Sequence, residues 1–91
     1  MPERHTAIVV IRNKLGLHAR AAAKLVEAAA RFQSNVRVKK DSESVDARSI
    51  LGLMILGARI GTQIEVIAEG PDAREALSAI LALIDAKFGE D

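Results

Sequence analysis

The stretch N-K-L-G-L-H-A-R-A-A-A-K-L, residues 13–25, marks the place where the pattern of the chain changes from strand to helix. Before it, T-A-I-V-V-I (residues 6–11) is a β-branched run, typical of a strand buried on much of both faces. After it, apolar residues recur at helical spacing at Ala22, Leu25, Val26, Ala29 and Phe32. Alanine, the strongest helix former, fills six of the eleven residues 19–29. We therefore expect a long helix that begins beside His18.

Three more segments alternate between apolar and polar residues, as strands with one face on the core do. Residues 35–39 and 44–47 predict an antiparallel hairpin around a polar turn at residues 40–44. Residues 63–69 predict a fourth strand.

Two more segments predict helices. Between Ser49 and Gly57 we expect a short helix that Ser49 caps and that closes near Gly57. The last helix follows Gly70-Pro71, where the spacing Asp72-x-x-Glu75 predicts a capping box, and its apolar stripe extends to Phe88.

The expected order is thus β-α-β-β-α-β-α. Because the helical stripes need an apolar partner, the simplest solution is a four-stranded, mainly antiparallel sheet with the helices packed on one face and water on the other. This is an α+β fold, and we expect residues 1–91 to form a single domain.

Composition excludes several function classes. The chain of 91 residues has no cysteine, which excludes disulfides and thiolate catalysis, and no second histidine or carboxylate cluster stands at ligand spacing to His18, so we expect no metal. The longest apolar run, residues 50–58, is far shorter than the roughly 20 residues that span a bilayer. Residues 1–6 lack the pattern of a signal peptide. We therefore expect a cytoplasmic protein without membrane insertion.

Charge is unevenly distributed along the chain. Residues 1–40 carry nine Lys or Arg against two Glu, whereas residues 41–91 carry four against ten carboxylates. The basic half predicts an anionic partner, or the two halves lie against each other or are simply solvated.

His18 falls at the N-terminal edge of the first helix, where unpaired N–H groups and the positive end of the helix dipole attract anions. The same field favours a neutral imidazole with a nitrogen free to attack a phosphoryl group, and the guanidinium of Arg20 suits phosphate oxygens. Residue patterns alone leave open that His18 is a helix cap or a surface residue. His5 is interpreted as a surface residue.

The segment G-L-H-A-R (residues 16–20) resembles the active-site signature of the HPr family, the histidine phosphocarriers of the phosphoenolpyruvate-dependent sugar phosphotransferase system. S-I-L-G-L-M (residues 49–54) resembles the family's regulatory serine segment, and A-E-G (residues 68–70) precedes the last helix as it does there. The resemblance extends from about residue 6 to residue 88 and implies an open-faced β-sandwich, in agreement with the expected order.

The resemblance implies a function for His18. It would accept a phosphoryl group on Nδ1 from phosphorylated enzyme I and pass it to enzyme IIA domains, while Arg20 and the backbone N–H groups of Ala19 and Arg20 hold the phosphate. The protein would be a monomeric, stoichiometric carrier without a cofactor and not an enzyme in its own right.

The resemblance also implies a regulatory site and a docking face. Ser49 would be phosphorylated by HPr kinase/phosphorylase, unless it serves only as a helix cap. The partner proteins would dock on an exposed apolar ring around the histidine, formed by Leu17, Ile50, Leu51 and Met54 together with Ala19.

Ala21 replaces the proline that commonly follows His-x-Arg in the family, and Leu15 replaces a residue that is often polar, so we expect a changed loop stiffness or transfer rate. Two rival functions remain. A nucleic-acid-binding module would need exposed aromatic residues, but Phe32 and Phe88 both fall on helical stripes, so we expect no nucleic acid. A regulatory or nitrogen-branch member of the same family is the nearer alternative.

Overall fold

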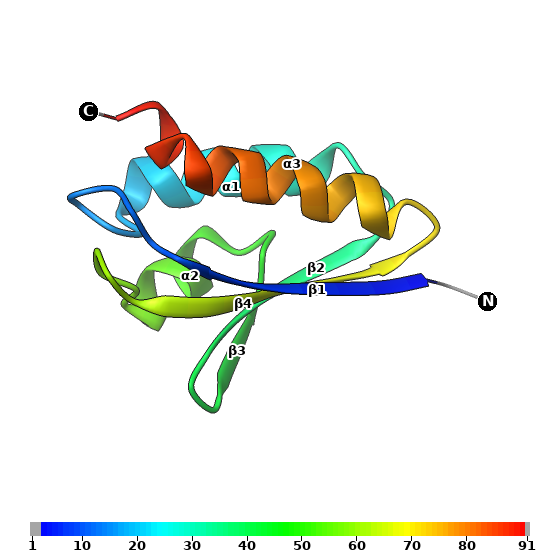
Figure 1. Ribbon diagram of the computed structural model, residues 1–91, viewed down its shortest axis with the longest axis horizontal. Coiled ribbons are helices and arrows are strands. Elements are labelled where there is room, and N and C mark those ends of the chain that lie inside the picture. The colour runs from blue at the N-terminus through cyan, green and yellow to red at the C-terminus, as the bar shows by residue number, and fades with distance from the viewer. Residues whose placement is uncertain (1–2, 91) are drawn as a thin grey trace.

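The computed structural model describes residues 3–90 as one sheet with three helices and a final 3-10 turn (Figure 1). The elements are β1 (Glu3–Val10), α1 (Ala19–Ala30), β2 (Asn35–Lys40), β3 (Glu43–Asp46), α2 (Ile50–Leu56), β4 (Gln63–Gly70), α3 (Ala73–Asp85) and η1 (Lys87–Gly89). The predicted order is confirmed.

The four strands form one antiparallel sheet in the spatial order β1-β4-β2-β3. Its inner face is built from residues of the two central strands that are at most 2% exposed: Val36, Val38, Ile64, Val66 and Ala68. α1 and α3 run antiparallel to each other across this face, while α2 packs against α1 and β3 near one end of the sheet (Figure 1). The opposite face is open, so the predicted open-faced α+β architecture is confirmed.

One prediction for β1 is wrong. We expected this strand to be buried on much of both faces, but its residues alternate, and Ile8 and Val10 are 63% and 45% exposed. β1 lies at the edge of the sheet, and its outward side chains lie on the face that no helix covers. Only Ala7 and Val9 pack against the core from the central part of this strand.

α2 is capped as predicted. The Ser49 hydroxyl accepts a hydrogen bond from the N–H of Gly52 at 2.9 Å, which satisfies one of the free donors at the start of the helix. Gly57 ends the helix in the left-handed conformation, with φ +69°.

The predicted capping box of α3 is wrong. Asp72 stands at the N-cap position, but its carboxylate accepts hydrogen bonds from Ser34 and Gln33 in the α1–β2 connection. The hydrogen bonds from the Ser34 hydroxyl and the Gln33 N–H lower the pKa of Asp72. The side chain therefore ties two connections together instead of capping its own helix.

The last helix is shorter than predicted. α3 ends at Asp85, and Phe88, which we placed on its apolar stripe, lies in η1. Phe88 is still 1% exposed, because Lys87 and Phe88 adopt left-handed backbone conformations, with φ +57° and +55°, that turn the chain back onto the core. Within residues 3–90, no helix has the length and apolar character needed to cross a membrane.

Candidate functional site

The loop before α1 is fixed by backbone contacts with the connection between α2 and β4. The N–H of Leu17 donates to the carbonyl of Ala58 at 2.9 Å, and Gly61 N–H donates to the carbonyl of Ile11 at 2.8 Å. Gly16 adopts φ +65°, and a Cβ at this position would overlap the Ala58 carbonyl oxygen. Only glycine therefore permits this close approach, which sets the position of the next two residues.

His18 is the N-cap residue of α1, as the sequence predicts. Its backbone is extended, and its side chain makes no capping hydrogen bond. The first hydrogen bond of the helix runs from the N–H of Ala22 to the His18 carbonyl at 2.8 Å, so the N–H groups of residues 19–21 lie at the exposed helix end. The His18 side chain is 26% exposed and stands beside this positive helix terminus.

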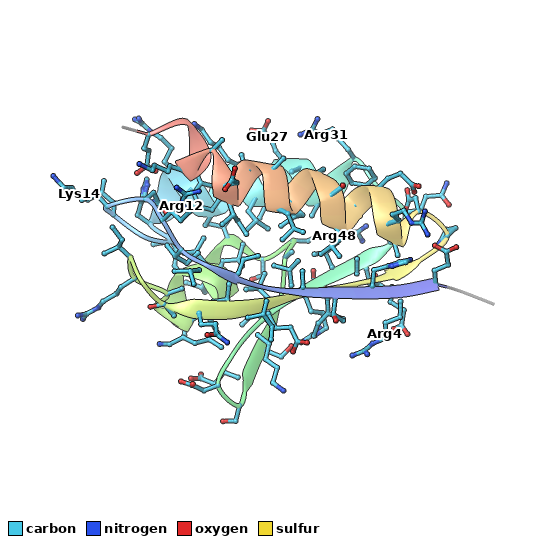
Figure 2. The ribbon with its side chains drawn as sticks, in the orientation of Figure 1. Arg4, Arg12, Lys14, Glu27, Arg31 and Arg48 are labelled. Carbon is cyan, nitrogen blue, oxygen red and sulfur yellow. The ribbon has the colours of Figure 1, made fainter. Side chains whose placement is uncertain are left out.

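A pocket of about 770 Å³ opens around His18. The residues that line it are Lys14, Leu15, His18, Ala19, Arg20, Lys24, Gly89 and Glu90. Three of them are cations from the basic half of the chain, and Figure 2 shows Lys14 projecting from the loop into solvent. The positive field of these side chains adds to that of the helix end and favours an anion. The pocket thus brings together all three residues of the predicted phosphate site.

The two halves of the chain also contact each other through charges. Arg12 forms an ion pair with Asp85 at 2.6 Å, and the carboxylate of Glu90 lies against His18. The two halves therefore lie against each other, which was one of the expected alternatives, while an anionic partner for the basic half stays a prediction. Within residues 3–90, no group of three or more His, Asp or Glu side chains is arranged to hold a metal ion.

Sequence analysis missed two residues of this site, Asn13 and Glu90. The Nε2 atom of His18 is hydrogen-bonded to Oε2 of Glu90, and Oε1 of Glu90 accepts from the amide of Asn13 at 3.3 Å. Glu90 is 72 residues from His18 along the chain, so no local spacing indicates the contact. Asn13 is 0% exposed, and its amide also donates to the Gly16 carbonyl at 2.7 Å.

Most of the side chains predicted for the docking face are exposed. Ile50, Leu51 and Met54 are 42%, 67% and 41% exposed on α2. Leu17 is instead 5% exposed, because its N–H contact with Ala58 turns its side chain into the core, so it cannot belong to an exposed ring. Three exposed residues were missed, namely Leu15, Ile55 and Ile60. For Ile55 a signal existed, since it follows Leu51 by four residues on the same helical face.

Ser49 lies at the start of α2, directly before Ile50 and Leu51 of this exposed face. It is half-buried, and its hydroxyl oxygen accepts from Gly52 N–H. The structure therefore confirms the predicted capping role of Ser49, while its phosphorylation stays a prediction.

Comparison with known proteins assigns the chain to a family. The family profile described as PTS HPr component phosphorylation site matches residues 5–86. Phosphocarrier protein HPr of Cupriavidus necator is 49% identical, over 99% of this chain and 98% of that protein. Phosphocarrier protein NPr of Shewanella violacea is 46% identical over 90% of each chain.

Solved structures agree. The crystal structure of HPr-C-His from Thermoanaerobacter tengcongensis matches with a TM-score of 0.92 and 45% identity, over 96% of this chain and 98% of that one. A crystal structure of an HPr dimer from the same organism matches with a TM-score of 0.77 and 48% identity, over 90% and 94% of the two chains. The chain therefore matches phosphocarrier proteins over nearly its whole length, including the site at the start of α1. We conclude that this protein belongs to the HPr family of phosphocarrier proteins of the phosphotransferase system.

Proposed function

We propose that this protein accepts a phosphoryl group on Nδ1 of His18 from phosphorylated enzyme I and donates it to enzyme IIA domains, in the cytoplasm and as a monomer. The observation that carries the proposal is the position of His18: it is the N-cap residue of α1 at a pocket with three cations, and its Nε2 atom is hydrogen-bonded to Glu90. Nδ1 is therefore the nitrogen that we propose as the phosphoryl acceptor.

The chemistry balances without a metal or a cofactor. The Nδ1 lone pair forms the P–N bond while the bond between phosphorus and the donor atom of enzyme I breaks, and that electron pair stays with the donor. Because Nδ1 carries no proton, none has to leave the ring. The imidazole keeps its Nε2–H and gains positive charge, and transfer to an enzyme IIA domain reverses the step.

Arg20 and the backbone N–H groups of Ala19 and Arg20 are proposed to hold the phosphoryl oxygens. Both residues are exposed at the helix end, where the N–H groups precede the first intrahelical hydrogen bond. The guanidinium can donate two parallel hydrogen bonds to phosphate oxygens. The partners are proposed to dock on the apolar face of Leu15, Ile50, Leu51, Met54 and Ile55, with Leu17 left out because it is buried.

Ser49 is proposed as a second, regulatory site that HPr kinase/phosphorylase phosphorylates. It lies at the first turn of α2, where a phosphate is compatible with the helix, and beside Ile50 and Leu51, where added negative charge changes a docking surface. The alternative function is that of a regulatory carrier of the nitrogen branch. The similarity to an NPr protein is the observation that supports this alternative.

Intact-mass analysis tests the carrier proposal. The protein is incubated with phosphoenolpyruvate and an enzyme I that is active on another carrier, beside a His18→Ala variant. One added phosphoryl group that brief acid treatment removes and that the variant lacks supports the proposal. If an enzyme I from the sugar branch and one from the nitrogen branch both leave the mass unchanged, the proposal is wrong. The branch whose enzyme I reacts faster identifies the pathway.

A further inference from the structure

The segment after α3 is built to bring a carboxylate onto His18. Lys87, Phe88 and Gly89 follow one another in the left-handed conformation, with φ +57°, +55° and +77°. For the two residues that are not glycine this backbone is sterically unfavourable. Burial of Phe88 to 1% exposure offsets that cost. The turn is therefore a fixed part of the fold, and it places Glu90 beside His18.

Two contacts hold this segment against the N-terminal half of the chain. Lys24 on α1 donates from Nζ to the carbonyl of Phe88 at 2.6 Å, and Asn13 donates to Oε1 of Glu90 at 3.3 Å. The Glu90 side chain is 18% exposed, and its Oε2 atom contacts Nε2 of His18. Each carboxylate oxygen thus has a different partner, which fixes the orientation of the group.

The protonation state of Glu90 determines which His18 nitrogen carries the proton. The hydrogen bond with His18 is the largest influence on the pKa of Glu90 and lowers it, and the Asn13 hydrogen bond acts in the same direction against the effect of burial. Glu90 is therefore ionised near neutral pH, and an ionised carboxylate can only accept. The Nε2 atom of His18 must be the donor, so in the neutral ring the proton is on Nε2 and the lone pair is on Nδ1.

We propose that Glu90 is a positioning residue for phosphoryl transfer: its carboxylate holds His18 in the tautomer with hydrogen on Nε2 and balances the positive charge that the ring gains when Nδ1 bonds to phosphorus. This inference rests on the proposed carrier function of His18. It adds a role for a residue outside the segment of residues 16–20 that resembles the family signature. It also explains why the chain maintains a strained turn at residues 87–89.

The test uses three variants of the full-length protein. Glu90→Ala removes the acceptor, whereas Glu90→Gln keeps an acceptor oxygen and removes the charge. Glu27→Ala is the matched control, because it removes one carboxylate from the exposed outer face of α1, where Figure 2 shows Glu27 pointing away from the sheet. Backbone amide spectra establish that each variant is folded.

The first readout is the ¹⁵N NMR spectrum of the His18 ring at pH about 9, where imidazoles are neutral. We expect the original protein and Glu27→Ala to show protonated Nε2 and unprotonated Nδ1, and Glu90→Ala to show a mixture of tautomers. Glu90→Gln should also show a mixture, because His18 and Asn13 compete for its single acceptor oxygen and its NH2 group can donate to an unprotonated Nε2. The second readout is the rate of phosphorylation by phosphorylated enzyme I. We expect a loss of about tenfold for Glu90→Ala, a loss of similar size for Glu90→Gln, and no change for the control.

A His18 ring spectrum of Glu90→Ala that equals that of Glu27→Ala would overturn the proposal. So would equal phosphorylation rates for these two variants. Failure of the carrier function itself is distinguishable, because then the original protein is not phosphorylated at all, while the ring spectra still report whether Glu90 fixes the tautomer.

Discussion

At the scale of single residues, Gly16 is the position on which the geometry of the site depends most directly. It combines a φ of +65° with a backbone approach so close that a Cβ would overlap the Ala58 carbonyl oxygen and lie 3.0 Å from the Arg59 Cα. A side chain here must either strain the backbone or push the loop of residues 57–62 away. Either change moves Leu17 and, through it, His18.

We predict that Gly16→Ala lowers the free energy of unfolding by about 2 kcal/mol or more, from the left-handed backbone and the steric contact together. Gly61→Ala is the matched control, since Gly61 has φ +85° but a Cβ there has no atom within 4 Å. It should show the backbone cost alone, about 1 kcal/mol. Urea unfolding measures both variants. Equal losses at the two positions would contradict the role given to the Ala58 contact.

At the scale of elements, α2 combines a structural cap with the proposed docking surface, and Ser49 has a proposed role in both. Its hydroxyl caps the helix at Gly52, while the next two residues are exposed and apolar. A variant that keeps the cap and adds charge separates these two roles. Aspartate does so, because it is about as good an N-cap as serine.

We predict that Ser49→Asp unfolds at nearly the same urea concentration as the original protein, while its KM for phosphorylation by enzyme I rises about tenfold through charge at the docking face. Ser49→Ala should lose about 1 kcal/mol of stability without this rise in KM. Ser42→Asp is a control at the exposed tip of the β2–β3 hairpin, which projects away from α1 in Figure 1. A similar KM for the two aspartate variants would refute a specific regulatory site.

Sequence patterns predicted the helices and strands well where the apolar residues of the periodic pattern are also the buried ones. α2 was predicted with both ends, because Ser49 and Gly57 act on neighbouring backbone groups. β1 was misjudged, because Ile8 and Val10 are apolar but exposed, and composition does not distinguish this from burial. The capping box failed since the donors that occupy Asp72 lie 38 and 39 residues away. Glu90 was missed for the same reason, because it reaches His18 through packing and hydrogen bonds between segments that are far apart along the chain.

At the scale of the whole molecule, the architecture separates two surfaces that both expose aliphatic side chains. One is the proposed docking face on α2, with Leu51 67% exposed, and the other is the open face of the sheet, with Ile8 63% exposed. The α2 face lies at the end of the molecule where α1 begins (Figure 1), whereas Ile8 lies on the edge strand β1, on the face of the sheet that no helix covers. Equal exposure therefore does not imply an equal function, because the α2 face belongs to a helix that packs against α1, the helix that begins at His18.

A pair of polar substitutions tests this distinction. Leu51→Gln and Ile8→Thr each remove an exposed aliphatic side chain and keep the residue preference of a helix or a strand. We predict that both change the free energy of unfolding by no more than about 0.5 kcal/mol, as surface substitutions do. Only Leu51→Gln should raise the KM for phosphorylation by enzyme I, by about tenfold, because it removes an anchor from a buried interface while kcat stays the same. If Ile8→Thr raises KM as much as Leu51→Gln does, the partner contacts the open face of the sheet, and the docking face proposed on α2 is wrong.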